Sequence, residues 1–173
     1  MNFQIEKAIE ILSQTPETIN SLLRNLSNEW IESDEDQESW NPFDVVGHFI
    51  HGEETDWIPR AKIILAQGEN LTFEPFDRFA QFEKSKEKSL PELLDEFTDL
   101  RAANIEILRE MNLTDEHLEL KGIHPELGEV NLRQFLATWV VHDLNHIRQI
   151  TNILARKYAK NVGVWKEYLS ILN

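Results

Sequence analysis

Four long stretches of the chain carry apolar residues at helical spacing, and polar segments separate them. The first stretch predicts a helix from Asn2 to Trp30. Pro16 lies inside it and is expected to kink this helix or split it in two. The acidic segment 32–39 that follows is expected to form a loop. The apolar positions of this helix are Phe3, Ile5, Ile9, Leu12, Ile19, Leu22, Leu23 and Leu26.

The second and third helices have clear start signals. Asn41 is a good N-cap, and Pro42 stands at the first helical position, where its missing N–H costs nothing. This helix is expected to continue to Ala66, before Gly68, with a bend at Pro59. The third helix is expected to start at Ser89, which has capping-box spacing to Glu92, and to end near Met111.

The fourth helix is expected to run from Asn131, with Gln134 three residues on, to Ala159. A short C-terminal helix that covers an end of the core should follow. Its apolar positions are Val162, Trp165 and Leu169.

The second connection, 67–88, is unusually long for a compact bundle. Its 22 residues can reach roughly 70 Å, whereas a 25-residue helix is about 37 Å long. The connection can therefore cross the bundle and leave the second and third helices parallel, as in known four-helix folds with crossovers. Four of its residues, Phe73, Phe76, Phe79 and Phe82, are expected to cap the core or to line a ligand pocket. The third connection can hold a β-hairpin that turns at Gly128.

Composition and charge narrow the classes of function. A chain of 173 residues suggests a single domain over 1–173. The formal net charge of −14 disfavours binding to nucleic acid and to anionic lipid. The sequence contains no cysteine, which excludes disulfides, thiolate nucleophiles and cysteine-ligated metals. It shows neither a signal peptide nor a membrane-spanning stretch, so we expect a soluble cytoplasmic protein.

The histidines carry the most informative pattern. His142 and His146 are four residues apart on the fourth helix, so they project from one side of it, on the stripe that includes Trp139. Two histidines at this spacing on one helix can bind the same metal ion. Two core histidines bonded to carbonyls or to a carboxylate are the alternative. Neither the H-E-x-x-H motif nor the E-x-x-H motif is present.

Three stretches of the sequence resemble the DinB-like family, a widespread group of bacterial four-helix bundles. They are 40–53, 124–130 and 139–150, and their order and separation match the family pattern. The resemblance implies an all-α four-helix bundle in up-down-down-up order and one divalent metal. In that family the histidine of the first stretch joins the two of the third around the metal. Carried over, this gives a metal triad of His48, His142 and His146.

The resemblance also implies a homodimer. The outward face of the fourth helix offers a partner surface at Ala137, Val141 and Leu144, and the alternative is that the C-terminal segment covers this face. Among the other histidines, His51 is expected to be partly exposed, and His124 to lie in a loop near an end of the bundle.

Three imidazoles leave a coordination position open, as in catalytic zinc sites. Members of the family include S-transferases that use thiols such as bacillithiol or mycothiol. We therefore expect a metal-dependent enzyme acting on a small molecule, with zinc or nickel as the metal. It would be a hydrolase, or an S-transferase with a low-molecular-weight thiol as cosubstrate. A non-catalytic metal-binding domain and a plain helical interaction domain are the alternatives.

The sequence identifies no general base. Glu53 is expected to pair with Arg60 or with a cation on another helix. Asp143 is expected to orient a metal-binding histidine without contacting the metal itself.

Overall fold

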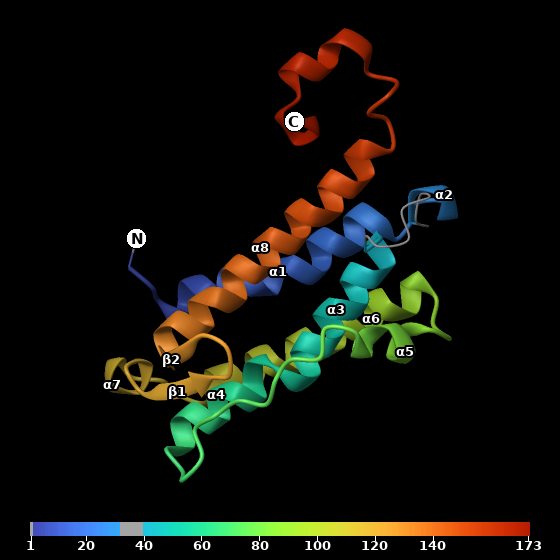
Figure 1. Cartoon of the computed structure of the whole chain (residues 1–173). Coiled ribbons are helices and arrows are strands. Elements are labelled where there is room, and N and C mark those ends of the chain that lie inside the picture. The colour runs from blue at the N-terminus through green and yellow to red at the C-terminus, as the bar shows by residue number, and fades with distance from the viewer. Residues whose placement is uncertain (1, 32–39) are drawn as a thin grey trace.

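The computed structural model describes residues 2–31 and 40–173, which form a bundle of long helices (Figure 1). Helices α1 (Ile5–Leu23) and α8 (Leu132–Arg156) lie side by side. The pair α3 (Pro42–Thr55) and α4 (Trp57–Ala66) packs against α6 (Leu90–Glu110) and runs parallel to it. This is the all-α four-helix bundle in up-down-down-up order that the sequence predicts. The segment 32–39, expected to be a loop, lies outside the described residues.

Shorter elements connect the long helices and follow the last one. They are α2 (Asn28–Ile31), α5 (Ala80–Ser85), α7 (Asp115–Leu118), β1 (Lys121–His124), β2 (Gly128–Asn131) and the 3-10 helices η1 (Gly163–Tyr168) and η2 (Ser170–Leu172).

The capping signals work as the sequence predicts. The N–H of Asp44 donates to Asn41 Oδ1 (2.9 Å), and the N–H of Asn41 donates to Asp44 Oδ2 (3.0 Å). The N–H of Ser89 donates to Glu92 Oε2 (2.7 Å) at the start of α6. These reciprocal bonds satisfy N–H groups that the first helical turn leaves unpaired, so they fix where the helices begin.

The first predicted helix divides at a different place from the one expected. Helix α1 continues through Pro16 and ends at Leu23, and Trp30 belongs to the separate helix α2. Asn25 and Ser27, which favour turns and caps over helix interiors, lie in the break between them.

The second predicted helix divides at Asp56, between α3 and α4, rather than bending at Pro59. Proline has no N–H for the carbonyl of the residue four positions earlier, and its ring crowds that carbonyl. Here the carbonyl belongs to Thr55, so the effect of Pro59 appears one turn before the proline itself.

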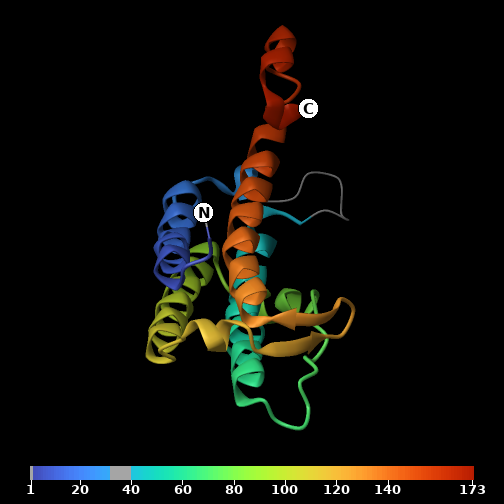
Figure 2. The same ribbon diagram turned by 90° about the vertical axis from the view of Figure 1, so that its left-hand side faces the viewer.

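The long connection 67–88 is held by the hairpin of β1 and β2. The N–H of Phe73 donates to Ile123 O (2.9 Å), and the N–H of Ile123 donates to Leu71 O (2.9 Å). Strands β1 and β2 are antiparallel, with His124 opposite Gly128, which confirms the expected hairpin. Gly128 adopts φ +77°, which favours glycine at the turn. Figure 2 shows the hairpin at the foot of α8.

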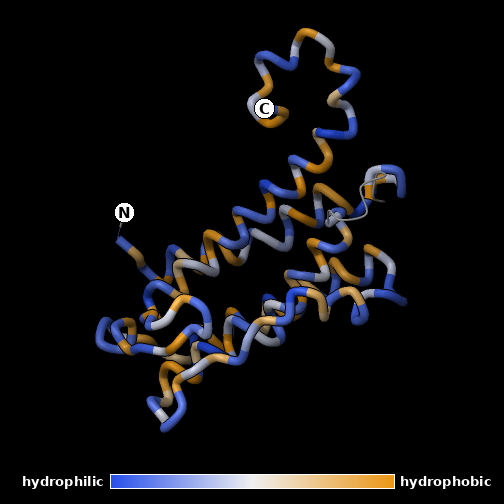
Figure 3. Tube along the Cα trace, viewed as in Figure 1, coloured by the Kyte–Doolittle hydropathy of each residue, from blue (hydrophilic) through white to orange (hydrophobic). Residues whose placement is uncertain are grey.

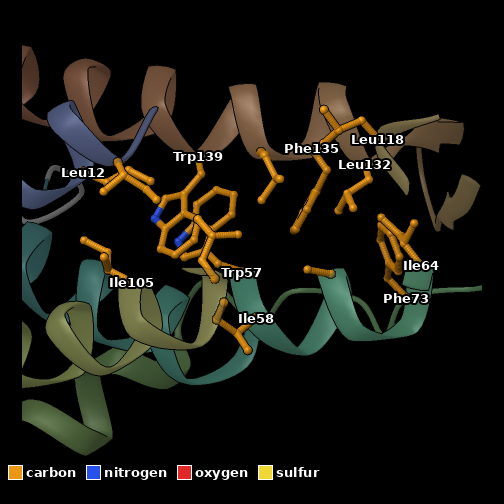
Figure 4. Packing of buried hydrophobic residues seen from close by; sticks show 14 residues of the cluster. Leu12, Trp57, Ile58, Ile64, Phe73, Ile105, Leu118, Leu132, Phe135 and Trp139 are labelled. Carbon is orange, nitrogen blue, oxygen red and sulfur yellow. The ribbon is translucent and has the colours of Figure 1, made fainter. Parts of the chain in front are cut away.

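Apolar positions recur between polar ones along each long helix (Figure 3), and those that are buried form two clusters. In the first, Trp57 of α4 and Trp139 of α8 stack with ring centroids 5.4 Å apart and planes at 7° (Figure 4). In the second, Phe49 of α3 stacks on Phe97 of α6 at 4.9 Å.

The C-terminal segment differs from its prediction. Helix α8 ends at Arg156 rather than Ala159, because the chain tightens into bonds such as Lys157 N–H to Leu154 O (3.2 Å). The residues beyond form 3-10 helices at the end of α8 that projects past the bundle (Figure 1). Trp165 is 67% exposed, so it does not cover the core. Within the described residues, no helix is long and apolar enough to span a membrane.

Candidate metal centre

Three histidines meet at the centre of the bundle. His48 comes from α3, and His142 and His146 come from successive turns of α8. One ring nitrogen of each can be chosen so that all three lie within 4.8 Å of one another. The Nε2 atoms of His48 and His142 are 3.0 Å apart. The structure thus brings together the three residues of the expected triad.

The ring nitrogens fit a metal ion better than they fit one another. His146 Nδ1 donates to Gln149 Oε1 (2.7 Å), which leaves its Nε2 with a free lone pair. Among residues 2–31 and 40–173, no group pairs with the buried Nδ1 atoms of His48 and His142, although buried polar atoms are normally paired. Nitrogen ligands 2.0–2.1 Å from a tetrahedral zinc lie about 3.3 Å apart. The 3.0 Å between the two Nε2 atoms is close to that separation.

The surroundings keep two of the rings neutral. Burial, followed by the nearby His142 and His146, lowers the pKa of His48 to about 3. Burial and then His142 lower the pKa of His146 to about 4, against a smaller opposing effect of Gln149. Neutral imidazole is the form that binds metals, so the site is prepared for a cation without needing to lose protons at neutral pH.

Aromatic rings enclose the triad on most sides. Trp40 lies 4.9 Å from His48 and stacks on His146 at 6.3 Å and 17°, measured between ring centroids and planes. Trp57 meets His142 edge-on at 5.1 Å. The His142 side chain is still 21% exposed, so the cluster keeps an opening to solvent.

The four phenylalanines of the long connection have separate roles. Phe73 is 1% exposed and belongs to the core. Phe76 meets His48 edge-on at 5.4 Å and lies 4.9 Å from His51. Phe79 and Phe82 are exposed. The expectation of a partly exposed His51 was wrong: it is 5% exposed, and Phe76 packs against its ring.

Behind the histidines lies a buried ion network, of which the sequence predicted only that Glu53 pairs with a cation. Arg101 of α6 donates to Asp143 Oδ2 (2.6 Å) and Oδ1 (3.1 Å) and, from Nε and Nη2, to Glu53 Oε1 (3.0 and 2.8 Å). Asn104 donates to Glu53 Oε2 (3.0 Å). The cation that pairs with Glu53 is therefore Arg101, whereas Arg60 pairs with Asp56 (2.6 Å).

Pro16 contributes to this network. Proline cannot donate to the carbonyl four residues earlier, which is that of Leu12. Arg101 Nη1 donates to this Leu12 O at 2.8 Å. The buried arginine thus satisfies the carbonyl that the proline leaves free, which explains how α1 continues through Pro16 in the core.

The network reaches the triad through Asp143. Burial would raise the pKa of this carboxyl, but Arg101 and its hydrogen bonds keep it below the usual value. Asp143 Oδ1 lies 3.9 Å from His142 Nδ1, which is longer than a hydrogen bond but places a carboxylate next to the nitrogen through which such groups orient a ligating imidazole. Asp143 therefore stands where the sequence expects it, behind a candidate ligand.

One feature of the sequence could have indicated that Arg101 is buried in an ion pair. It stands between Phe97 and Ile105, four residues from each, on the apolar face of the third predicted helix. A charged residue on such a face must be paired if it is buried.

Two other histidines lie apart from the triad. His124 is in β1, where its Nδ1 accepts from the N–H groups of Glu126 and Leu127, each at 3.2 Å. His117 is the third residue of α7 and caps it together with Thr114. Both have local structural roles in the hairpin region.

Comparison with known proteins agrees with this fold. The family model of the DinB superfamily matches residues 11–150, so the chain belongs to the DinB superfamily. Among solved structures it is similar to YfiT from Bacillus subtilis, described as a probable metal-dependent hydrolase with an unusual four-helix bundle topology. The two share 24% sequence identity and a TM-score of 0.75, over 89% of this chain and 87% of YfiT, and the likeness shows a common fold. No curated protein matches the chain.

Proposed function

We propose that the whole chain, 1–173, acts as one domain that binds a divalent metal through His48, His142 and His146 and hydrolyses a small molecule. The observation that carries the proposal is the convergence of three ring nitrogens within 4.8 Å, beside a partly exposed His142. Membership of the DinB superfamily and the description of YfiT support it. Zinc and nickel are the metals proposed, since three imidazoles suit either. A cytoplasmic location stays a prediction from the sequence.

Different residues of this chain would bind the metal, orient its ligands and exclude water. His48, His142 and His146 would hold the metal, and such a metal supplies Lewis acidity and activates water near neutral pH. Gln149 fixes the tautomer of His146 through its 2.7 Å bond. Trp40, Trp57 and Phe76 restrict water around the triad, which strengthens electrostatic interactions there.

The proposal predicts hydrolysis that depends on the triad. Zinc- or nickel-loaded protein should hydrolyse an activated ester such as 4-nitrophenyl acetate, and His142→Ala should lower the rate by roughly two orders of magnitude because a ligand is lost. Circular dichroism of the variant should match that of the wild type. Equal rates for His142→Ala and wild type would contradict the proposal.

The same assay separates the alternatives. Turnover that requires an added low-molecular-weight thiol would favour the S-transferase. Metal binding without turnover in either assay would favour a non-catalytic metal-binding domain.

We also propose that two copies of the chain pair through α8. Val141 is 63% exposed and Leu144 is 48% exposed, while Ala137 is half-buried. The C-terminal segment does not cover this face, because Leu169, Ile171 and Leu172 of that segment line an apolar pocket with Leu22 and Trp30 instead. The apolar face of α8 is thus open to a second copy.

Light scattering after gel filtration tests the pairing. We expect wild type at twice the monomer mass and Val141→Glu at the monomer mass, since a charge in an apolar interface costs several kcal/mol. Val164→Glu, at a residue that is 83% exposed in the C-terminal segment, is the matched control and should stay dimeric. A monomeric wild type would refute the pairing.

A further inference from the structure

The connection 67–88 carries aromatic rings that reach the triad. Phe76 lies edge-on to His48, and Phe79 and Phe82, further along the same connection, stack with centroids 6.3 Å apart. Phe82 in turn meets Trp40 edge-on at 6.4 Å, and Trp40 contacts His48 and His146. A continuous strip of aromatic rings therefore leads from the triad to the surface.

The outer end of this strip is uncovered. Phe79 is 64% exposed and Phe82 is 38% exposed. Single exposed apolar residues are common on protein surfaces, but rings stacked in continuity with a candidate centre form a surface on which a flat apolar group can lie. The strip therefore suits a ligand with an apolar body.

Arg78 directly precedes Phe79 in the sequence, at the outer end of this strip. Asp77 Oδ1 accepts the N–H of Phe79 (2.9 Å), and the N–H of Ala80 donates to Asp77 O (3.3 Å), so the turn that presents Arg78 is fixed. The Arg78 side chain is exposed.

Within the described part of the chain, the charge of Arg78 is not paired with a carboxylate. Arg60 and Arg101 are paired with carboxylates, whereas Arg78 has no ion-pair partner among residues 2–31 and 40–173. The formal net charge of −14 repels anionic molecules at long range, so holding one requires a local cation. An arginine suits carboxylate and phosphate because its planar fork donates two parallel hydrogen bonds.

We propose that the substrate of this site is an anion with an apolar body, whose carboxylate or phosphate group binds Arg78 while its apolar part lies on Phe79 and Phe82. This proposal rests on the proposed function, because it assigns the substrate class of the same site. Arg78 and the two rings determine specificity, and the histidines take no part in this selection.

A matched pair of small ligands tests the proposal. The probes are 3-phenylpropionate and its neutral amide, 3-phenylpropanamide, titrated into the full chain by ligand-observed NMR. The first titration uses chelator-treated protein, so that the carboxylate cannot bind a metal, and the second uses zinc-loaded protein. In the chelated wild type the acid should bind about five- to tenfold more tightly than the amide.

Three variants locate the effect. Arg78→Met should bring the acid-to-amide ratio close to one. Lys86→Met removes a 72% exposed cation from the end of the same connection and should keep the wild-type ratio. Phe79→Ser should weaken both ligands by a similar factor and leave their ratio unchanged. Equal affinities for acid and amide in wild type, or an unchanged ratio in Arg78→Met, would overturn the proposal.

Metal content measured on the same samples distinguishes this proposal from the proposed function. A chain that binds no zinc but shows the Arg78-dependent preference supports the anion site and refutes the metal-dependent activity. A chain that binds zinc and hydrolyses esters without any preference for the acid refutes the anion site alone.

Discussion

Arg101→Met is expected to lower the free energy of unfolding by about 3–5 kcal/mol, the usual cost of breaking a buried ion pair by removing one partner. The Arg101 side chain is 1% exposed, and those of Glu53 and Asp143 are fully buried. Methionine has a similar length and fills most of the space, so the loss comes from two carboxylates left without a cation. Urea denaturation at neutral pH measures the change.

The matched control is Arg109→Met on the same helix. Arg109 pairs with Glu106 at the surface, with side chains 50% and 67% exposed, and should lose no more than about 0.5 kcal/mol. Adding Glu53→Gln and Asp143→Asn to Arg101→Met should recover part of the loss, since it removes the unpaired charges. A loss of under about 1 kcal/mol in Arg101→Met would show that the network contributes little to stability.

The metal-free protein should become less stable as the pH falls from 6.5 towards 4. The folded pKa is about 3 for His48 and about 4 for His146, against an ordinary value of 6.5 in the unfolded chain. Between these values the unfolded state binds more protons than the folded state, so acid favours unfolding. The dependence fades as the pH rises through 6.5, where the unfolded histidines lose their protons. From pH 7 to pH 5 each histidine alone costs about 2 kcal/mol, and the coupled pair about 2–4 kcal/mol.

The pH slope of urea denaturation curves on chelated protein tests this. His48→Gln should flatten the slope between pH 5 and pH 7, whatever its effect on absolute stability. His117→Gln is the control, because glutamine at this position still completes the capping box with Thr114, and its slope should match wild type. The same slope in His48→Gln and wild type would show that His48 is not the group responsible.

Local signals in the sequence predicted much of the fold. Asn41, Ser89 and Asn131 cap their helices as expected, because a cap depends on residues only three positions apart. The break at Asp56 and the exposed 3-10 segment after Arg156 were missed. The break at Asp56 depends on the effect of Pro59 on the preceding helical turn, and the 3-10 segment depends on where the other helices of the bundle end. The spacing of apolar residues encodes neither feature.

In the candidate site, too, local sequence signals were read correctly and tertiary contacts were missed. Spacing put His142 and His146 on one helix face, and the family resemblance added His48. The structure brings the three rings together. Arg101 and Asn104 were missed because their partners are distant in the sequence: Arg101 lies 48 residues from Glu53 and 42 from Asp143, and Asn104 lies 51 from Glu53. Only tertiary packing brings these pairs within hydrogen-bond distance.

Metal content per chain is the most direct test of the central claim that His48, His142 and His146 form a metal centre. Untagged wild type, His146→Ala and the control His124→Ala would be incubated with zinc at pH 8, desalted and measured by elemental analysis. We expect about one zinc per chain in wild type and in His124→Ala, and almost none in His146→Ala, because two imidazoles hold zinc far more weakly than three. No zinc in wild type, or equal zinc in His146→Ala, would contradict the account.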